Sequence, residues 1–244
     1  MASITIRPGT LADSQAISRV HYEALSTYHD FYAAFLQKHP REIISIGTDR
    51  SLRDPEVVVA VAEDVVAGEI VGFIRYKTMN PNSNANKKLD ETQAPPAAAA
   101  PKEHLEDLWQ RFCAREAEMD ACKKEAVDGQ RHYEISNLMV DPAHQRKGIG
   151  GRLLKSVIDK ADADGAPAVI VSSAEGHGLY LRNSFRVLGT WTIDNEHWAG
   201  EIAKREGDIP ELADRKSREL LVRRCRGMRE VEDCMIRLPS FRSS

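Results

Sequence analysis

The sequence of 244 residues predicts a single α/β (α+β) domain with a mixed, mostly antiparallel sheet and helices on both faces. Two observations predict this class. Residues 132–165 have the pattern of a strand, a glycine-rich turn and an amphipathic helix. Residues 57–76 contain two β-rich runs joined by a short loop, which is the pattern of an antiparallel hairpin.

The elements expected before the central stretch alternate between strands and helices. They are a strand over 3–7, a helix over 10–25, a helical region over 31–52 that breaks at Pro40, and hairpin strands over 57–63 and 69–76. Asp13 is placed to cap the first helix. Gly72 indicates a bulge or a close backbone approach. The expected core contacts of the 31–52 region are Phe35, Leu36, Ile43, Ile44 and Ile46.

Two polar segments interrupt this pattern, and we expect both to be insertions into the one domain over residues 1–244. The first, 79–131, holds a low-complexity loop (79–101) and a charged helix (102–127) that either gates the substrate or is a plain surface helix. Its apolar stripe comprises Leu105, Leu108, Trp109, Phe112 and Met119. The second, 194–230, is charged and predicts a long loop with a helix near 212–224.

The segments after the central stretch complete the sheet. They predict a buried strand over 168–172, a short helix over 179–185, a strand over 186–193, and a last strand over 231–238 that pairs with 186–193.

Composition argues against several classes of protein. Lys plus Arg is 34 against Asp plus Glu at 37, so the net charge of -3 favours neither nucleic acid nor an anionic membrane as partner. The chain shows no membrane-spanning run and no secretory signal, so we expect an intracellular protein, cytoplasmic or nuclear. The scattered histidines and the distant cysteines (Cys113, Cys122, Cys225 and Cys234) lack metal-ligand spacing, so we expect no metal and four reduced thiols.

The central turn has the sequence Gln145-Arg146-Lys147-Gly148-Ile149-Gly150-Gly151. A strand, turn and helix in this order aim free backbone N–H groups and the positive end of the helix at one point, which suits a phosphate or pyrophosphate. A Walker A loop would need Gly-Lys-Ser/Thr, and a dinucleotide fingerprint would need glycine where Leu153 stands. The pattern Gln/Arg-x-x-Gly-x-Gly/Ala remains, beside the alternative of a turn with no ligand.

This pattern resembles the coenzyme A pyrophosphate loop of the GCN5-related N-acetyltransferase (GNAT) superfamily. The strand ending at 138–142 is similar to that of the family. The segment 173–185 resembles its second signature, Leu-Tyr-x-x-x-Gly-Phe, with Ser184 in place of the glycine. The resemblance covers most of 3–78, 132–193 and 231–239, and it implies a GNAT-like sheet with acetyl-CoA as cosubstrate.

The resemblance implies roles for individual residues. The backbone of the strand end, where the family's strand splays from its neighbour, would pair with the pantetheine arm, and the loop amides would hold the pyrophosphate. The implied coenzyme A-binding residues are Leu138, Met139, Val140, Gln145, Arg146, Lys147, Gly148, Ile149, Gly150, Gly151 and Ser173.

Two catalytic side chains are implied as well. Tyr180 matches the tyrosine that protonates the leaving thiolate, and a phenol with a pKa near ~10 suits that role. Glu134 matches the glutamate that serves as base in the histone-acetylating branch of the family. The alternatives are a packed aromatic for Tyr180, and an ordinary strand glutamate with water as the base for Glu134. His132 could also be a base and His177 could touch coenzyme A or substrate, although each also fits a surface or loop histidine.

The implied function is that of an acyltransferase: an acetyl-CoA-dependent N-acetyltransferase that passes the acetyl group directly to a primary amine in a ternary complex. The implied partners are acetyl-CoA and an amine acceptor, either a small molecule or a protein amine, with a homodimer left open. Two alternatives are a catalytically inactive acyl-CoA-binding sensor or scaffold and a protein-interaction module. The sequence does not identify the acceptor.

Overall fold

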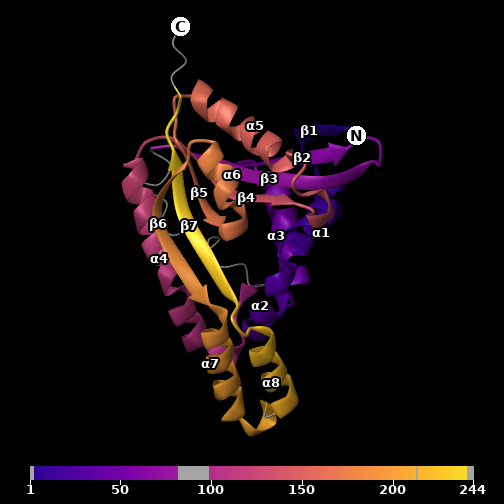
Figure 1. Ribbon diagram of the computed structural model, residues 1–244, viewed down its shortest axis with the longest axis vertical. Coiled ribbons are helices and arrows are strands. Elements are labelled where there is room, and N and C mark those ends of the chain that lie inside the picture. Colours follow the sequence, from indigo (N-terminus) through magenta and orange to yellow (C-terminus); the bar gives the residue numbers. More distant parts are fainter. Residues whose placement is uncertain (1–2, 82–98, 213, 241–244) are drawn as a thin grey trace.

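A computed structural model describes residues 3–81, 99–212 and 214–240 (Figure 1). The strands are β1 (Ile4–Pro8), β2 (Val57–Asp64), β3 (Glu69–Met79), β4 (His132–Val140), β5 (Ala168–Ser173), β6 (Arg186–Asp194) and β7 (Arg229–Arg237). The α-helices are α1 (Ser14–Ala24), α2 (His29–Phe35), α3 (Pro40–Arg53), α4 (Glu106–Val127), α5 (Ile149–Ala163), α6 (Ala174–Arg182), α7 (Asn195–Gly207) and α8 (Arg215–Arg224). Short 3-10 turns include η1 (Leu11–Asp13), η2 (Ser26–Tyr28) and η6 (Pro142–His144).

The described strands form one seven-stranded sheet in the order β1-β2-β3-β4-β5-β7-β6. Each neighbouring pair in it is antiparallel except β4 and β5, which are parallel. A β-strand followed by a parallel neighbour needs a crossover, and α5 provides it. The predicted mixed, mostly antiparallel sheet is confirmed, as is the pairing of the last strand with β6.

Helices cover both faces of this sheet (Figure 1). On one face α5 and α6 pack onto β3, β4 and β5, in a core that holds Leu153, Ile135, Ile170 and Tyr180. On the other face α1 packs against β2 and β3. There α4 also contacts β5 and β7, and with α2 and α7 it forms a second, aromatic-rich core. Residues that alternate along a strand therefore face different helices, which decides where each site residue points.

Three local expectations need correction. The Asp13 side chain does not cap α1, because its carboxylate accepts hydrogen bonds from the Thr10 backbone at 2.8 Å and from Arg7 at 2.8 Å. Ile46 is 39% exposed rather than a core contact. The short helix begins at Ala174 instead of residue 179. It runs through Gly176, where an added Cβ would lie 2.9 Å from the Ser172 hydroxyl, so glycine permits close packing on β5.

The segment 194–230 is mostly helical, not a long loop. Asp194 caps α7 by accepting from the His197 backbone N–H at 2.9 Å, and Ala199 and Ile202 are fully buried against α2 and α4. A few apolar residues at helical spacing are enough to hold a polar helix once tertiary packing covers them. The predicted apolar stripe of 102–127 is confirmed in α4, where Leu108 and Phe112 are buried. Most of the predicted loop 79–101 lies outside the described residues.

The feature that positions the site is the way β4 leaves β5. Pairing between these strands runs from Tyr133–Ala168 to Ile135–Ile170 and then stops, although both strands continue. A bulge at Ser136 shifts the register of β4 against β3 at this point, and bulges bend the strand that carries them. The ends of β4 and β5 therefore splay apart. Gly72 faces this end of β4 closely, since a Cβ there would lie 3.1 Å from the Met139 carbonyl oxygen.

Candidate active site

The loop of residues 145–151 joins the splayed end of β4 to the first turn of α5. Arg146 and Gly148 both have left-handed backbone angles, with φ of 61° and 78°, so the chain turns sharply on either side of Lys147. Gly148 is the N-cap of α5 and has no side chain with which to cap the helix. Residues 145–148 are exposed. In the described part of the chain no side chain caps the amides of the first turn, so they and the positive helix end face outward.

Contacts on either side hold this loop in place. Asp141 begins η6 by accepting from the Ala143 backbone N–H at 3.0 Å, and Arg19 of α1 pairs with the same carboxylate. The Gln145 side chain donates to the Val140 carbonyl oxygen at 3.2 Å, and the Lys147 ammonium donates to Ala143 O at 2.9 Å. The loop is thus shaped by its own residues while its amides remain available.

The strand end, the loop and α6 meet at one place. A Cβ on Gly150 would lie 3.4 Å from Leu179 of α6 and 3.5 Å from Leu138 of β4. Ser173 ends β5, is exposed, and is the N-cap of α6. The fold therefore brings together the three segments that sequence patterns single out, around the opening between β4 and β5.

Tyr180 lies on the inner face of α6. Its side chain is 4% exposed and packs edge-on against Phe185 at a ring distance of 5.3 Å. Burial raises the pKa of the Tyr180 phenol above its usual value. The phenol is therefore a proton donor rather than a base at neutral pH. Ser184, which replaces the family's glycine, has a left-handed φ of 65°, the conformation that glycine favours.

Glu134 lies on the opposite face of the sheet from Tyr180. Its carboxylate accepts from the Lys123 ammonium of α4 at 2.9 Å. Its register partner on β5, Val169, packs toward α4, whereas the next residue of β4, Ile135, belongs to the core that contains Tyr180. The two predicted catalytic side chains are therefore not neighbours.

The two histidines have local partners. The His132 ring lies 2.8 Å from the Gln130 carbonyl oxygen. The His177 ring nitrogen Nδ1 lies 2.6 Å from the Asp233 carboxylate, which is buried and also accepts from Thr190 at 2.6 Å. This contact ties α6 to β7.

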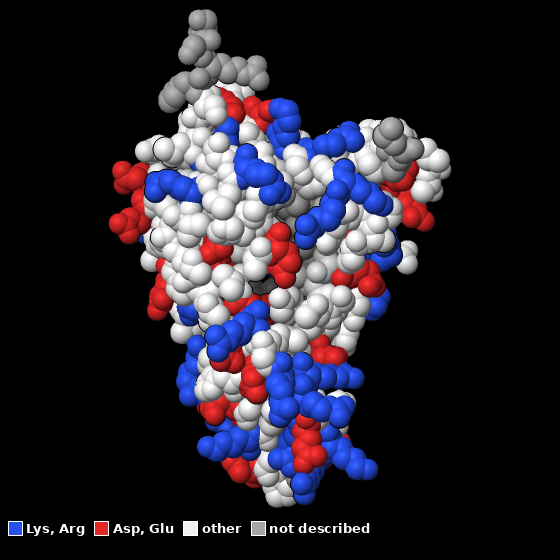
Figure 2. All heavy atoms as spheres, viewed as in Figure 1, with Lys and Arg blue, Asp and Glu red and all other residues white. Residues whose placement is uncertain are grey.

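A second polar group lies on β7 beyond the end of β5, and no sequence motif indicates it. The Glu230 carboxylate, on β7, accepts from the Asn195 amide at 2.5 Å and from the Tyr32 hydroxyl at 3.3 Å. The pKa of Tyr28 is raised by burial and then by Glu175 and Glu230, so the end of η2 lies near both carboxylates. The sequence signal that could have indicated this group is the pair of acidic residues Glu230 and Glu232, two apart in a largely buried last strand. Figure 2 shows a hollow near the middle of this face with acidic atoms beside it.

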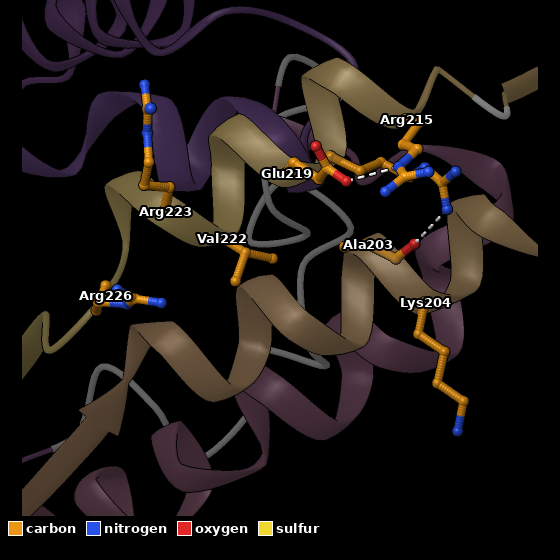
Figure 3. A pocket seen from close by; sticks show the side chains of 8 residues that line it. Ala203, Lys204, Arg215, Glu219, Val222, Arg223 and Arg226 are labelled. Atoms are coloured by element: carbon orange, nitrogen blue, oxygen red, sulfur yellow. Dashed lines mark hydrogen bonds and ion pairs between the residues drawn. The ribbon is translucent and has the colours of Figure 1, made fainter.

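A cavity of about 600 Å³ lies elsewhere, between α7 and α8. Figure 3 shows Lys204, Arg215, Arg223 and Arg226 around it, and Glu219 bound to Arg215. It contains none of the predicted site residues, so it is not the candidate active site.

Two further features concern the described residues alone. Within them no group of three His, Cys, Asp or Glu side chains is arranged to hold a metal ion. Searched over the same ranges, no helix has the length and apolar character needed to cross a membrane.

Three solved structures of acetyltransferases or acetyltransferase-like proteins resemble this fold. A mosquito arylalkylamine N-acetyltransferase-like protein (like 5b) is 16% identical, with 97% of this chain and 100% of that chain covered and a TM-score of 0.54. A histone acetyltransferase HPA2 and related acetyltransferase from Corynebacterium glutamicum is 17% identical, with 99% of each chain covered and a TM-score of 0.54. Arabidopsis thaliana NAA60, solved with a bisubstrate analogue, is 12% identical, with 98% and 100% covered and a TM-score of 0.51. At these identities the likeness shows the fold.

The family follows from the sequence itself. The sequence model of the acetyltransferase (GNAT) family matches residues 22–185, which include the loop and the Tyr180 segment. This chain belongs to the GNAT family of acetyltransferases. No curated protein sequence matches it significantly.

Proposed function

We propose that this protein transfers an acetyl group from acetyl-CoA directly to a primary amine within a ternary complex. One observation carries the proposal. The outward-facing amides of 145–151, the unpaired end of β4 and the helix that bears Tyr180 all border one opening in the sheet. Direct transfer needs the thioester and the amine held together, and an opening that passes between two strands admits them from different sides.

The loop would bind the pyrophosphate of acetyl-CoA. The amides of the first turn of α5 supply hydrogen bonds to an anion, and the helix end adds a favourable partial charge. The side chains of Arg146 and Lys147 are exposed beside them and add charge-assisted contacts. The pantetheine arm would pair with the backbone of 138–140, which lacks a partner on β5. A β4 N–H would then polarise the thioester carbonyl.

Tyr180 would act as the general acid. The amine nitrogen attacks the thioester carbonyl carbon, the carbon–sulfur bond breaks, and coenzyme A leaves as a thiolate. The phenol of Tyr180 gives its proton to that sulfur and is later reprotonated from solvent. A phenol whose pKa is raised by burial remains protonated until this moment.

The family resemblance implies Glu134 as the base, but the ion pair between Glu134 and Lys123 argues against this role. The Lys123 ammonium of α4 holds the Glu134 carboxylate in an ion pair at 2.9 Å, on the face of the sheet opposite Tyr180.

Purified protein mixed with acetyl-CoA and a panel of primary amines tests the proposed function. Thiol release that depends on both substrates and falls in Tyr180→Phe is the expected result. Coenzyme A that raises the melting temperature while no amine supports thiol release would instead identify a binding protein without turnover.

A further inference from the structure

We infer that Glu230 is the carboxylate that receives the proton of the acceptor amine, and that the acceptor arrives as a positively charged primary amine. This inference rests on the proposed function and names a residue and an acceptor charge that the family resemblance does not.

The register of the sheet places Glu230 at the opening. Ser173, the last residue of β5, pairs with Glu232 of β7. β7 begins at Arg229, so Glu230 lies beyond the end of β5 and two residues from Glu232. Residues two apart on a strand share a face. Glu232 bonds Arg115 of α4 at 2.8 Å, so both glutamates are on the face that carries α2 and α4. At that position Glu230 borders the gap through which a thioester would reach an amine.

The surroundings of Glu230 leave its charge unmatched. Its two hydrogen-bond donors, Asn195 of α7 and Tyr32 of α2, are neutral. The nearby cation, Arg115, bonds the neighbouring Glu232. Among residues 3–81, 99–212 and 214–240, no ion pair of Glu230 is found, in contrast with Glu134 and Lys123. An arriving ammonium group would supply the missing partner.

The chemistry of this carboxylate suits a base. Burial raises the pKa of Glu230, with Glu232 adding to the rise and Asn195, Tyr32 and Arg115 opposing it. A base works best when its pKa lies near the working pH, and a carboxylate raised in this way is nearer to it. The titratable groups that interact with it are Tyr32, Tyr28, Cys225, Glu232 and Arg115.

The proton transfer balances without another reactant. An alkylammonium, with a pKa near ~10, gives one proton to the Glu230 carboxylate, directly or through water, and becomes a neutral nucleophile. Attack then forms the carbon–nitrogen bond and releases the thiolate. The second amine proton and the proton on Glu230 leave to solvent after transfer. An ammonium acceptor supplies both the charge that pairs with this carboxylate and the proton that it removes, so the acceptor class is cationic amines.

Glu230→Gln tests the inference, with Glu232→Gln as the matched control on the same strand and face. We expect kcat/KM for the best amine to fall about 100-fold in Glu230→Gln. We expect the loss to shrink at alkaline pH, where the amine loses its proton unaided. The affinity for coenzyme A should not change. Glu232→Gln should lose far less, and Glu230→Asp, which keeps the carboxylate, should retain an intermediate rate.

The results that overturn the inference are separable from failure of the proposed function. If wild-type protein releases thiol with amines and Glu230→Gln matches it across the pH range, Glu230 is not the base. If Glu134→Gln, and not Glu230→Gln, shows a loss of kcat/KM that shrinks at alkaline pH, the base is Glu134. If wild-type protein binds coenzyme A but acetylates no amine, the proposed function fails and this inference falls with it. Thermal melts of each variant separate misfolding from lost chemistry.

Discussion

Ile135 of β4 pairs with Ile170 of β5, and beyond this pair the two strands no longer share a ladder. The bulge at Ser136 occurs at the next residue. One extra residue thus both ends the parallel pairing and turns the strand end toward the loop of 145–151. The opening that results lies beside the loop of 145–151 and the α6 helix that bears Tyr180.

Tyr180→Phe should reduce kcat by about 100-fold while leaving coenzyme A binding intact, because only the proton donor is removed. Since burial raises the pKa of Tyr180, the acid form persists as pH rises, and wild-type kcat should not fall between about pH 8 and 10. Steady-state kinetics across pH and calorimetric titration with coenzyme A measure both effects. Phe185→Leu, which changes the packing partner and keeps the phenol, is the control. A fall of wild-type kcat near pH 8 would contradict the assignment.

Gly150→Val should weaken coenzyme A binding by at least about tenfold. Its Cβ would already lie 3.4 Å from Leu179 and 3.5 Å from Leu138, so two further methyl groups occupy the space between α5, α6 and β4. Gly200→Val is the matched control, because an added Cβ there meets nothing within 4 Å. Titration calorimetry with coenzyme A compares the two variants. Equal affinity in both would place the ligand elsewhere.

Ser184→Gly should stabilise the fold by about 0.5–1 kcal/mol. Ser184 has a left-handed φ of 65°, a conformation that costs an L-residue about 1–2 kcal/mol. Glycine removes this cost, but the greater entropy of glycine in the unfolded chain offsets part of the gain in stability. Asn183→Gly is the control, because Asn183 has a φ of -104° and gains nothing. Urea unfolding measures both variants. A loss of stability in Ser184→Gly would mean that the serine side chain contributes more than its backbone angle costs.

The Asp13–Arg7 pair should make stability depend on acid pH. The hydrogen bond from Arg7 lowers the pKa of Asp13 to about 2. A carboxyl group whose folded pKa is depressed stabilises the fold above its unfolded pKa of ~3.9, and this contribution is lost as pH falls toward 2. Asp13→Asn should therefore be less stable than wild type at pH 7, and the difference should narrow between about pH 4 and 2. Urea unfolding at each pH, with Asp30→Asn as an exposed control, measures the difference. A constant difference at every pH would contradict this account.

Several elements of the candidate site could be predicted because their signals are local. The glycine-rich turn after β4, the apolar face of α5 and the Leu-Tyr segment of α6 each lie within a short run of sequence. Backbone preferences of glycine and proline act over the same range. The amphipathic stripe of α4 was visible for the same reason, although its packing partners on α2 and α7 were not.

The helices at 194–230 show where local reasoning fails. Their composition is charged, so the pattern predicts a loop, yet Ala199 and Ile202 are buried by α2 and α4. Helix formation there depends on partners more than eighty residues away in the chain, as the contact of Arg205 with Asp107 at 2.7 Å illustrates. Tertiary burial overrides a weak local preference.

The sequence by itself determined the turn of 145–151, the strand and helix on either side of it, and the segment that carries Tyr180. Each of these depends on residues adjacent in the chain, whose conformations sterics and hydrogen bonding decide locally. Only the tertiary structure decided the partners of the carboxylates. Glu134 pairs with Lys123 of α4, whereas Glu230, beyond the end of β5, accepts from the neutral side chains of Asn195 and Tyr32. The charge state of a carboxylate depends on which distant groups packing brings beside it, and no short stretch of sequence contains that information.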